Sequence, residues 1–349
     1  MPGFFPPLDP TFPGPSDPTS PPVLANNIYT PYFDPFFGYT TAERLVLPAG
    51  PRGSYTASNL YSFGDRLADD GGTFGAVPFF QAGGIPTPYT TGPYSSSGSL
   101  SDGPKWTTSL AQILGVPKTG RDTNYAYESA TARQVNNPDD PFQTTFNFEG
   151  QVSLFKLLNG RFLPTDLVTV TFGGNDLTVP GVNPTAADVS LTVEAIIDGL
   201  EDLAVLGAKH FLVTNLPDIT LAPLFGDPVI AGSLGIDSSI YEPLINQFNS
   251  ELSTSLDSFE RTTGLDIKEL DLNKLFDAIA ADPSIYGFSN IKESILANPP
   301  FPGSTPIYNP DIVGRDPLVQ HGTLFLDPFF NPTALGQSIM AETARSALT

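Results

Sequence analysis

The pattern of hydrophobic and polar positions changes near residue 58. Downstream of it, short apolar runs alternate with longer segments whose apolar residues recur at helical spacing. The run "DLVTVTF" (166–172) is almost continuously apolar and β-branched, which is typical of a strand buried on both faces of a parallel sheet. Similar runs predict further strands in "LYSF" (60–63), "NYAYESATA" (124–132, a short strand and its loop), "AKHFLVTNLPD" (208–218) and "LDIKELDL" (265–272).

Helical periodicity fills the spaces between these runs. Val189, Val193, Ile196 and Leu200 share one face of a helix predicted over roughly 185–206. A second amphipathic helix is expected around 240–259, and a last one from near Pro332 to the C-terminus. Strands separated by helices of this length indicate βαβ units. We therefore expect a three-layer α/β/α sandwich of flavodoxin-like type, with a mostly parallel five-stranded sheet, in a domain spanning 51–349.

The first 50 residues have a different texture. Eleven of the 37 prolines lie in the first 40 residues, among phenylalanine and tyrosine, without a helical or strand period. Proline fixes φ and removes a backbone donor, so we expect an extended, irregular arm over 1–50. Its aromatic content is too high for a solvated tail. The arm is therefore expected to bind its own domain or a neighbouring subunit.

The charge and composition of the chain argue against several classes of function. The 349-residue chain carries 37 acidic and 16 basic residues, a net charge of -21, which argues against binding nucleic acid or anionic lipid. It contains no cysteine, so disulfides and a cysteine nucleophile are excluded. No apolar run is long enough to span a membrane, and no secretory leader is evident. No His, Asp or Glu cluster has metal-ligand spacing, so neither a metal nor another cofactor is expected.

Polar loops follow three of the predicted strands. They read "GDRL" after the first strand, "ESAT" after the second and "GGND" after the third. In a parallel sheet the carboxyl ends of the strands meet at one edge, where the functional cleft lies. The sequence therefore predicts a cleft lined by these three loops.

These loops, in this order, resemble those of the SGNH hydrolases, the GDSL-type lipases and esterases. The resemblance runs from about Asn59 to Leu348 and includes "NLPDITLAP", "FNSELSTSL", "DLNKLFDAIAADPSIYGFSN" and "LFLDPFFNPTALGQSIMAETA". The agreement of all these blocks in the same order makes the resemblance specific. It implies an SGNH fold for 51–349 and, as the family activity, hydrolysis of ester bonds through a serine nucleophile.

The first two blocks depart from the family pattern. The family's Gly-Asp-Ser-Leu is here Gly64, Asp65, Arg66 and Leu67, so an arginine stands where the resemblance implies the nucleophile. A glycine N–H of the second block normally helps to form the oxyanion hole. Here that position falls near Ser129, whose backbone N–H is still a donor.

The third block is intact, whereas the last is altered. Gly173, Gly174, Asn175 and Asp176 match the family's third block, in which the asparagine amide completes the oxyanion hole. The last block is normally Asp-x-x-His followed by Pro-Thr, and alignment on that pair places Asn331 at the histidine position. Asp327 then lies one residue too far upstream, and Pro328 takes the aspartate's place, so we expect this aspartate to be out of register with residue 331.

These substitutions remove two catalytic roles. Arginine has no hydroxyl with which to attack, and asparagine cannot accept a proton at neutral pH. Only two histidines exist. His210 opens a strand and is expected to be structural, and no spacing supports His321 as a substitute base. We expect the Arg66 guanidinium to fill the cleft and to pair with a carboxylate or with backbone carbonyls there. The candidate partners are Asp65, Asp176 and Asp327, together with the side-chain oxygens of Asn175 and Asn331. The alternative is that Arg66 turns outward into solvent and leaves the cleft open.

The sequence therefore favours an SGNH-fold pseudoenzyme that acts as a structural or partner-binding subunit, through a protein partner or self-assembly of its N-terminal arm. Two alternatives stay open: an ester hydrolase with a rearranged active site, and a module that binds an ester or glycan without cleaving it. A small-molecule ester substrate belongs only to the alternatives. The expected location is extracellular or at the cell surface.

Overall fold

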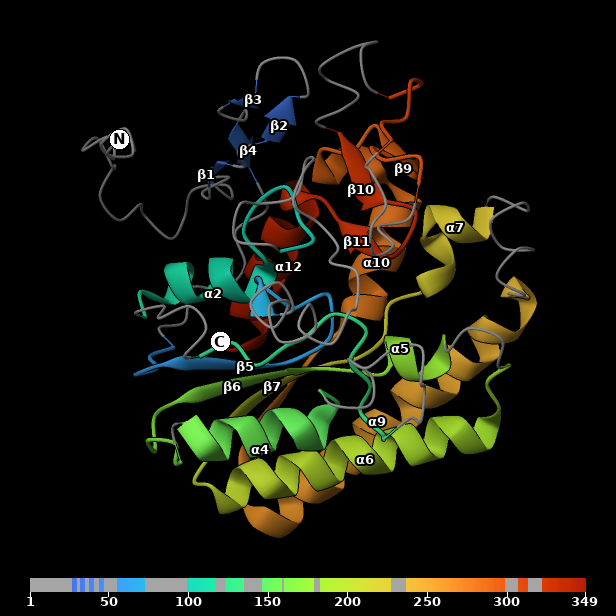
Figure 1. Ribbon diagram of the computed structural model, residues 1–349. Coiled ribbons are helices and arrows are strands. Elements are labelled where there is room, and N and C mark those ends of the chain that lie inside the picture. Colours follow the sequence, from blue (N-terminus) through green and yellow to red (C-terminus); the bar gives the residue numbers. More distant parts are fainter. Residues whose placement is uncertain are drawn as a thin grey trace, which may run out of the picture.

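The architecture comes from a computed structural model (Figure 1). The structure describes residues 55–72, 99–116, 123–134, 146–158, 160–178, 183–226, 237–298, 307–312 and 322–349, together with the backbone of four short strands between residues 27 and 46.

A parallel sheet forms the centre of the domain. Its strands stand in the order β5, β6, β7, β8, and they span Leu60–Gly64, Leu167–Thr171, His210–Thr214 and Asp266–Leu270. All three pairings are parallel, so the carboxyl ends of the strands lie at one edge. The expected fifth strand is reduced to one parallel bridge between Asn124 and Ser62. The segment nevertheless follows β5, because Tyr125 N donates to Ser62 O at 2.7 Å and Tyr127 N donates to Gly64 O at 3.0 Å.

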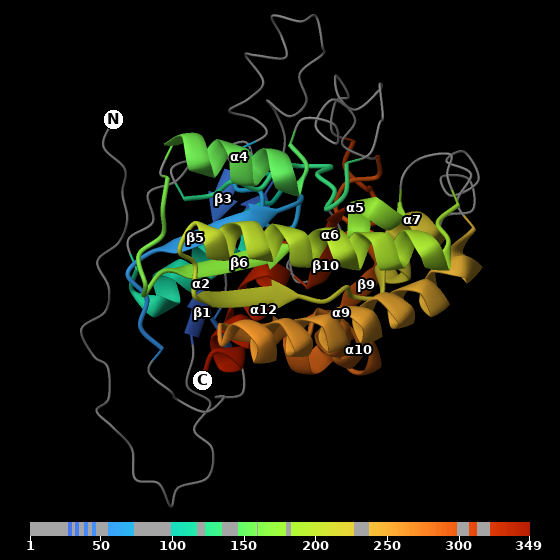
Figure 2. The same ribbon diagram turned by 90° about the horizontal axis from the view of Figure 1, so that it is seen from below.

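Helices cover both faces of this sheet (Figures 1 and 2). One face carries α4, α6 and α9, which span Phe148–Leu158, Ala186–Val205 and Tyr241–Thr263. The other carries α2, α10 and α12, which span Trp106–Leu114, Leu272–Ala281 and Ala334–Ala347. Side chains alternate along each strand, so Tyr61 and Phe63 join the first hydrophobic core and Leu60 joins the second. This is the three-layer α/β/α arrangement that the sequence predicts.

Local signals set the helix ends. Thr185 and Asp188 form a capping box at the start of α6, with Asp188 N donating to Thr185 Oγ1 at 3.3 Å. Gly264, in the left-handed region at φ 69°, ends α9. Asp271 caps α10 by accepting a hydrogen bond from Lys274 N at 2.9 Å. The last predicted helix begins at Ala334, two residues after Pro332.

Shorter elements complete the domain. A second sheet pairs β10 (Thr323–Asp327) in parallel with β9 (Asn290–Ser294) and antiparallel with β11 (Asn331–Pro332). The remaining single turns of helix are α5, η2, α7, η3 and η4, which span Gly174–Leu177, Ile219–Leu221, Pro223–Gly226, Ser238–Ile240 and Pro283–Tyr286.

The N-terminal arm contains strands that the sequence analysis does not predict. β1 (Asn27–Tyr29) pairs antiparallel with β4 (Arg44–Val46), and β2 (Tyr32–Asp34) pairs antiparallel with β3 (Gly38–Thr40). Each strand is only three residues long and rich in β-branched or aromatic residues, which fit a pleated strand. Three residues are too few to show the alternation of apolar and polar positions by which a strand is recognised in a sequence.

Candidate active site

The turn after β5 is held tightly against β6. A Cβ at Gly64 would lie 2.7 Å from Thr171 O, so only glycine fits there. The buried amide of Gln151 clamps this residue, because Oε1 accepts from Gly64 N and Nε2 donates to Gly64 O, both at 2.8 Å. Asp65 Oδ1 accepts from Leu67 N at 3.0 Å and closes the turn. Position 66 therefore emerges from the sheet edge on a rigid backbone.

Arg66 is paired with a carboxylate, as the sequence analysis expects, but the partner is one that it did not name. Arg66 Nη2 lies 3.3 Å from Glu128 Oε1, and the side chains are only 15% and 10% exposed. The guanidinium carbon also lies 4.7 Å from the centre of the Phe329 ring, in a cation–π contact. Glu128 comes from the second loop and Phe329 from the last. Residues of three separate segments thus converge where the resemblance implies the nucleophile.

Buried groups fix the backbones of both partners. Asp69 Oδ2 accepts from Glu128 N at 3.1 Å, and Asp69 Oδ1 accepts from Gly71 N at 2.9 Å. The fully buried Lys105 Nζ donates to Arg66 O at 2.7 Å and to Leu100 O at 3.0 Å. Burial lowers the pKa of Lys105 to about 8, although the charges of Asp69 and Asp327 oppose this. The backbone positions of both members of the ion pair are therefore fixed by buried side chains.

Ser129 adopts the backbone conformation of a glycine. Among the described residues it is the one non-glycine residue with a positive φ, at 61°. This left-handed conformation is unfavourable for a residue with a Cβ. It explains why the family pattern has glycine at this place. The backbone of the second loop thus has, at Ser129, a conformation that glycine adopts more readily than serine.

The intact third block has structural duties. Gly173 has φ 116°, and a Cβ there would lie 2.7 Å from the Phe248 ring. The buried Asp176 accepts from Ala132 N at 2.9 Å and from Arg133 N at 3.0 Å, which ties this block to the second loop. Burial raises the pKa of Asp176 to about 6. The Asn175 side chain donates from Nδ2 to Ala130 O at 2.9 Å.

The last block corrects the expectation for Asp327. Despite the additional residue, Asn331 Nδ2 donates to Asp327 Oδ2 at 2.8 Å, and both side chains are fully buried. The chain absorbs the extra residue in a tight turn, in which Phe329 N donates to Asp327 Oδ1 at 3.0 Å and Asn331 N donates to Phe329 O at 2.8 Å. An aspartate thus still orients the side chain at position 331. Burial raises the pKa of Asp327 to about 6.

The remaining candidates lie elsewhere. His210 stands at the amino end of β7, with Nδ1 2.9 Å from Asp266 Oδ2, at the edge opposite the cleft. His321 lies outside the described residues. Ser62 is buried within β5, where Thr169 Oγ1 donates to its Oγ at 3.0 Å. Neither His210 nor Ser62 approaches Arg66 as a replacement base or nucleophile.

Sequence reasoning missed Glu128, Phe329, Lys105 and Gln151. A signal existed for Glu128, because its loop departs from the family's glycine-rich pattern just as the nucleophile position becomes cationic. Lys105 and Gln151 lie in segments without a motif, and nothing in the sequence relates them to the cleft.

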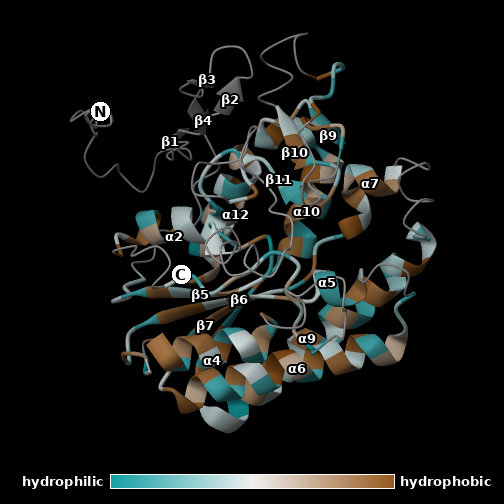
Figure 3. Ribbon diagram, in the orientation of Figure 1, coloured by the Kyte–Doolittle hydropathy of each residue, from teal (hydrophilic) through white to brown (hydrophobic). Residues whose placement is uncertain are grey.

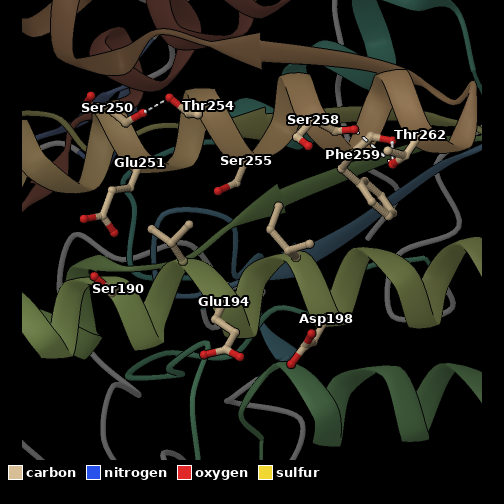
Figure 4. Close-up of a pocket in the computed structure, with 12 residues that line it drawn as sticks. Ser190, Glu194, Asp198, Ser250, Glu251, Thr254, Ser255, Ser258, Phe259 and Thr262 are labelled. Atoms are coloured by element: carbon tan, nitrogen blue, oxygen red, sulfur yellow. Dashed lines mark hydrogen bonds between the residues drawn. The ribbon is translucent and has the colours of Figure 1, made fainter.

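An open groove lies away from the cleft. It has a volume of about 560 Å³ and runs between α6 and α9 (Figure 4). Serine, threonine and carboxylate side chains line it, among them Ser250, Thr254, Glu194 and Asp198, without a histidine among the described residues. Thr254 Oγ1 donates to Ser250 O at 2.8 Å, within α9 itself. The groove therefore holds hydroxyls and carboxylates but, in the part of the chain that the structure describes, no histidine, so its lining does not reproduce the serine–histidine pair of the family's catalytic site.

The described part of the chain offers neither a metal-ion site nor a membrane-spanning helix. It holds no group of three or more His, Cys, Asp or Glu side chains arranged to bind a metal ion. No helix in that part combines the length and the apolar character that crossing a membrane requires.

Two curated proteins are similar to this chain in sequence. Over 242 residues, 68% of the chain, the sequence is 26% identical to a phosphatidylcholine-sterol acyltransferase of Aeromonas hydrophila. Over 84% of the chain it is 26% identical to a protein encoded in the trpE–trpG intergenic region of Pseudomonas putida. The matches cover 65% and 48% of these relatives.

A solved structure, the extracellular lipase of Streptomyces rimosus, aligns with 83% of this chain and 100% of its own, at a TM-score of 0.38 and 16% identity. Residues 60–344 match the family of GDSL-like lipases and acylhydrolases. The chain belongs to the GDSL-like lipase/acylhydrolase family.

Proposed function

We propose that this chain is a member of the family that does not hydrolyse esters and acts as a structural or partner-binding subunit. The ion pair between Arg66 and Glu128 carries the proposal. A permanently charged guanidinium stands at the nucleophile position, and its carboxylate partner stands beside the oxyanion position at Ser129. Neither group can form an acyl-enzyme by the family's route.

The last block supports the same proposal. Asn331 has the aspartate partner that a catalytic histidine would need, but an amide has no titratable nitrogen. The scaffold of a triad is therefore present without its two reactive groups. On this proposal a protein partner, or self-assembly through the N-terminal arm, provides the function. An exterior as acidic as this one suits an extracellular or cell-surface setting, which fractionation of the producing cells would test.

The names of the relatives give the competing functions. The Aeromonas relative is an acyltransferase by name, so acyl-ester chemistry is the alternative activity. A rearranged site would have to use a nucleophile other than residue 66. Ester or glycan binding without cleavage is the second alternative, and the left-handed backbone of Ser129 supports it, because this is the conformation that suits the glycine of the family pattern.

The test is an esterase assay on the purified full chain with short-chain p-nitrophenyl esters. We expect the rate of buffer alone. Removal of an oxyanion-hole donor costs a working enzyme about 10² to 10³ in kcat. Hydrolysis that falls by this amount in Asn175→Ala would therefore contradict the proposal. Hydrolysis unchanged in Asn175→Ala would indicate a contaminating esterase.

Gain of function provides the complementary test. The triple variant Arg66→Ser, Glu128→Gly and Asn331→His restores the nucleophile, clears its surroundings and places a base beside Asp327. The matched control keeps Asn331 and changes only the other two positions. We expect the triple variant to exceed this control by at least about 10², since general-base catalysis contributes roughly 10² to 10⁴. Equal rates in two folded variants would show that more than these three residues separates the chain from an esterase.

A further inference from the structure

Exposed apolar side chains gather at the end of the molecule opposite the cleft. Of the eight large hydrophobic residues that are exposed in the described part of the chain, four belong to this group. They are Leu157, Leu158, Leu163 and Val205, which are 80%, 60%, 53% and 80% exposed and are called the amino-edge patch below. Together they expose on the order of a few hundred Å², the size of patch that often marks a binding surface.

Three chain segments bring the patch together at the amino ends of β5 and β6. Leu157 and Leu158 end α4, Leu163 lies in the following loop, and Val205 ends α6. Phe162 joins these segments, because its ring stacks on Phe155 of α4 at 4.0 Å and its N–H donates to Leu206 O at 3.0 Å. Figure 3 shows the hydrophobic end of α4 beside the first strands of the sheet.

Basic residues flank the patch in an otherwise acidic protein. Lys156, Arg161 and Lys209 are all exposed, and each lies within four residues of a patch residue in the sequence. They are three of only 16 basic residues in a chain with 37 acidic ones. Exposed Glu201 and Asp202 lie in the preceding turn of α6, so the positive character belongs to the α4 side. An occupant with apolar and acidic side chains would complement this surface.

The N-terminal segment enters the domain at this same edge. Ser58 N donates to Thr165 O at 3.1 Å, two residues from Leu163, and the Tyr55 ring packs edge-on against His210, with centroids 6.4 Å apart. Asn27 pairs with Val46, which is nine residues from Tyr55. Nine residues span at most about 30 Å, so the segment before Asn27 starts within reach of the patch. Its 26 residues could extend about 80 Å as polyproline helix.

We propose that residues 1–26 of the same chain bind the amino-edge patch. This segment contains Phe4, Phe5 and Phe12 among nine prolines, and its side chains carry two negative charges, at Asp9 and Asp17, with no lysine or arginine. It thus supplies aromatic groups for the exposed leucines and carboxylates for the basic flank. Its proline content lowers the entropy lost when it becomes ordered.

Other occupants fit less well. The segment is tethered to the domain, which gives it an effective concentration that approaches the millimolar range for short linkers. A separate molecule of equal affinity would need a similar concentration in solution to compete with it. Two copies of a chain with net charge -21 repel one another, and an anionic membrane would repel either copy. The inference rests on the binding role proposed for the arm, but it places residues 1–26 on their own domain instead of in a self-assembly contact. It does not require the loss of catalysis, so the esterase assay tests a separate statement.

The absence of cysteine from the chain allows a direct experiment. Val205→Cys places a thiol in the patch, and Leu191→Cys, on the same helix and 52% exposed, is the matched control about 20 Å away. Each is labelled with a maleimide in the full chain, with and without Phe4→Ser, Phe5→Ser and Phe12→Ser together. We expect these serines to speed labelling of the thiol at position 205 roughly tenfold, equivalent to about 1.4 kcal/mol of binding, and to leave labelling at position 191 unchanged.

Charge reversal sharpens the result. Lys156→Glu with Arg161→Glu should also expose the thiol at position 205, and adding Asp9→Lys with Asp17→Lys should restore most of the protection. The proposal would be overturned if the thiol at position 205 were labelled at the same rate with and without the three phenylalanine substitutions. Protection that grows with protein concentration would overturn it too, because it would identify a second copy as the occupant. Far-UV circular dichroism and Tm confirm that each variant is folded.

Discussion

The carboxyl ends of β5 and β6 lie side by side, yet they relate to the family pattern in opposite ways. At the end of β6, residues 173–176 keep the family residues, and at the end of β5 an arginine replaces the serine. Three of the kept residues have clear structural roles. Gly173 makes room for Phe248, Asn175 donates to Ala130 O, and Asp176 holds two N–H groups of the second loop.

Position 66 has no comparable duty. Its backbone carbonyl is held by Lys105, but its side chain points away from the sheet toward Glu128 and Phe329. Since Glu128 and Phe329 belong to other segments, we expect a substitution at this position to leave the strand and the turn in place. An intact third block is therefore a sign of the fold, whereas the residue at position 66 is a sign of the chemistry.

The largest expected effect falls on the β6 side. Gly173→Ala adds a Cβ at φ 116° and 2.7 Å from the Phe248 ring, so we expect a loss of roughly 2 to 4 kcal/mol in the free energy of unfolding. Gly174→Ala is the matched control, because the nearest atom to a Cβ there is Asp65 Oδ2 at 3.8 Å. Urea denaturation measures both. Equal losses would show that the backbone at residue 173 is not the constraint.

The next effect probes the β5 side. Glu128→Gln removes the carboxylate that lies 3.3 Å from a guanidinium only 15% exposed, and we expect a loss of about 3 kcal/mol in the free energy of unfolding. Adding Arg66→Met removes the charge that Glu128 balances and should recover most of the loss. A double variant as unstable as the single one would mean that Glu128 stabilises the loop independently of Arg66. Urea denaturation of the three chains, together with Arg66→Met alone, gives the coupling energy directly.

The pH dependence of stability tests both sides together. Burial raises the pKa of Asp65, Asp102, Asp176 and Asp327 to about 6, above the ordinary value of 3.8. Between pH 4 and 6 the folded chain therefore holds more protons than the unfolded chain, and stability falls as pH rises through this window. We expect Tm to be several degrees higher at pH 5 than at pH 7, at about 1 kcal/mol for each carboxyl group.

Asp102→Asn provides the control for this pH effect. The new amide can still accept the hydrogen bond from Ala334 N, now 2.6 Å from Asp102 Oδ1, without a titrating group. The difference in Tm between pH 5 and pH 7 should shrink by about a quarter, since one of the four carboxyl groups whose pKa is raised to about 6 is removed. A Tm that instead rises from pH 5 to pH 7 would contradict the raised pKa values.

Much of the fold was predictable, because periodicity is strong in its main elements. The run at 166–172 and the helical face of Val189 and Val193 correspond to β6 and α6. In place of the strand expected at 124–132, the structure has a single bridge between Asn124 and Ser62. The rest of the segment follows β5 through a few backbone hydrogen bonds. The sequence analysis missed α4, whose short apolar face consists of Phe148, Val152 and Phe155.

The candidate site was predictable in position but not in its contacts. Motif order locates the cleft, and a cation at position 66 calls for an anion. Which carboxylate supplies it depends on the loops, and the three aspartates of the motif blocks drew attention away from Glu128. The turn at residues 328–330 shows the same limit, because one added residue changes spacing in the sequence without separating Asp327 from Asn331 in space. Rules based on the sequence spacing of motif residues assume a fixed loop shape, so they fail where a tight turn takes up an added residue.

The smallest expected effect concerns the cation–π contact between Arg66 and Phe329, which lies at the end of β5. Phe329 presents its ring to the Arg66 guanidinium at 4.7 Å. Phe329→Leu keeps an apolar side chain but removes the ring quadrupole, so we expect to lose about 0.5 to 1 kcal/mol beyond the change in packing. The same substitution in an Arg66→Met background loses only the packing term, and the difference between the two losses is the coupling energy. Urea denaturation of the four chains of this cycle provides the measurement. A coupling energy of zero would mean that Phe329 only covers the ion pair, and that the Arg66–Glu128 pair alone distinguishes the end of β5 from the end of β6.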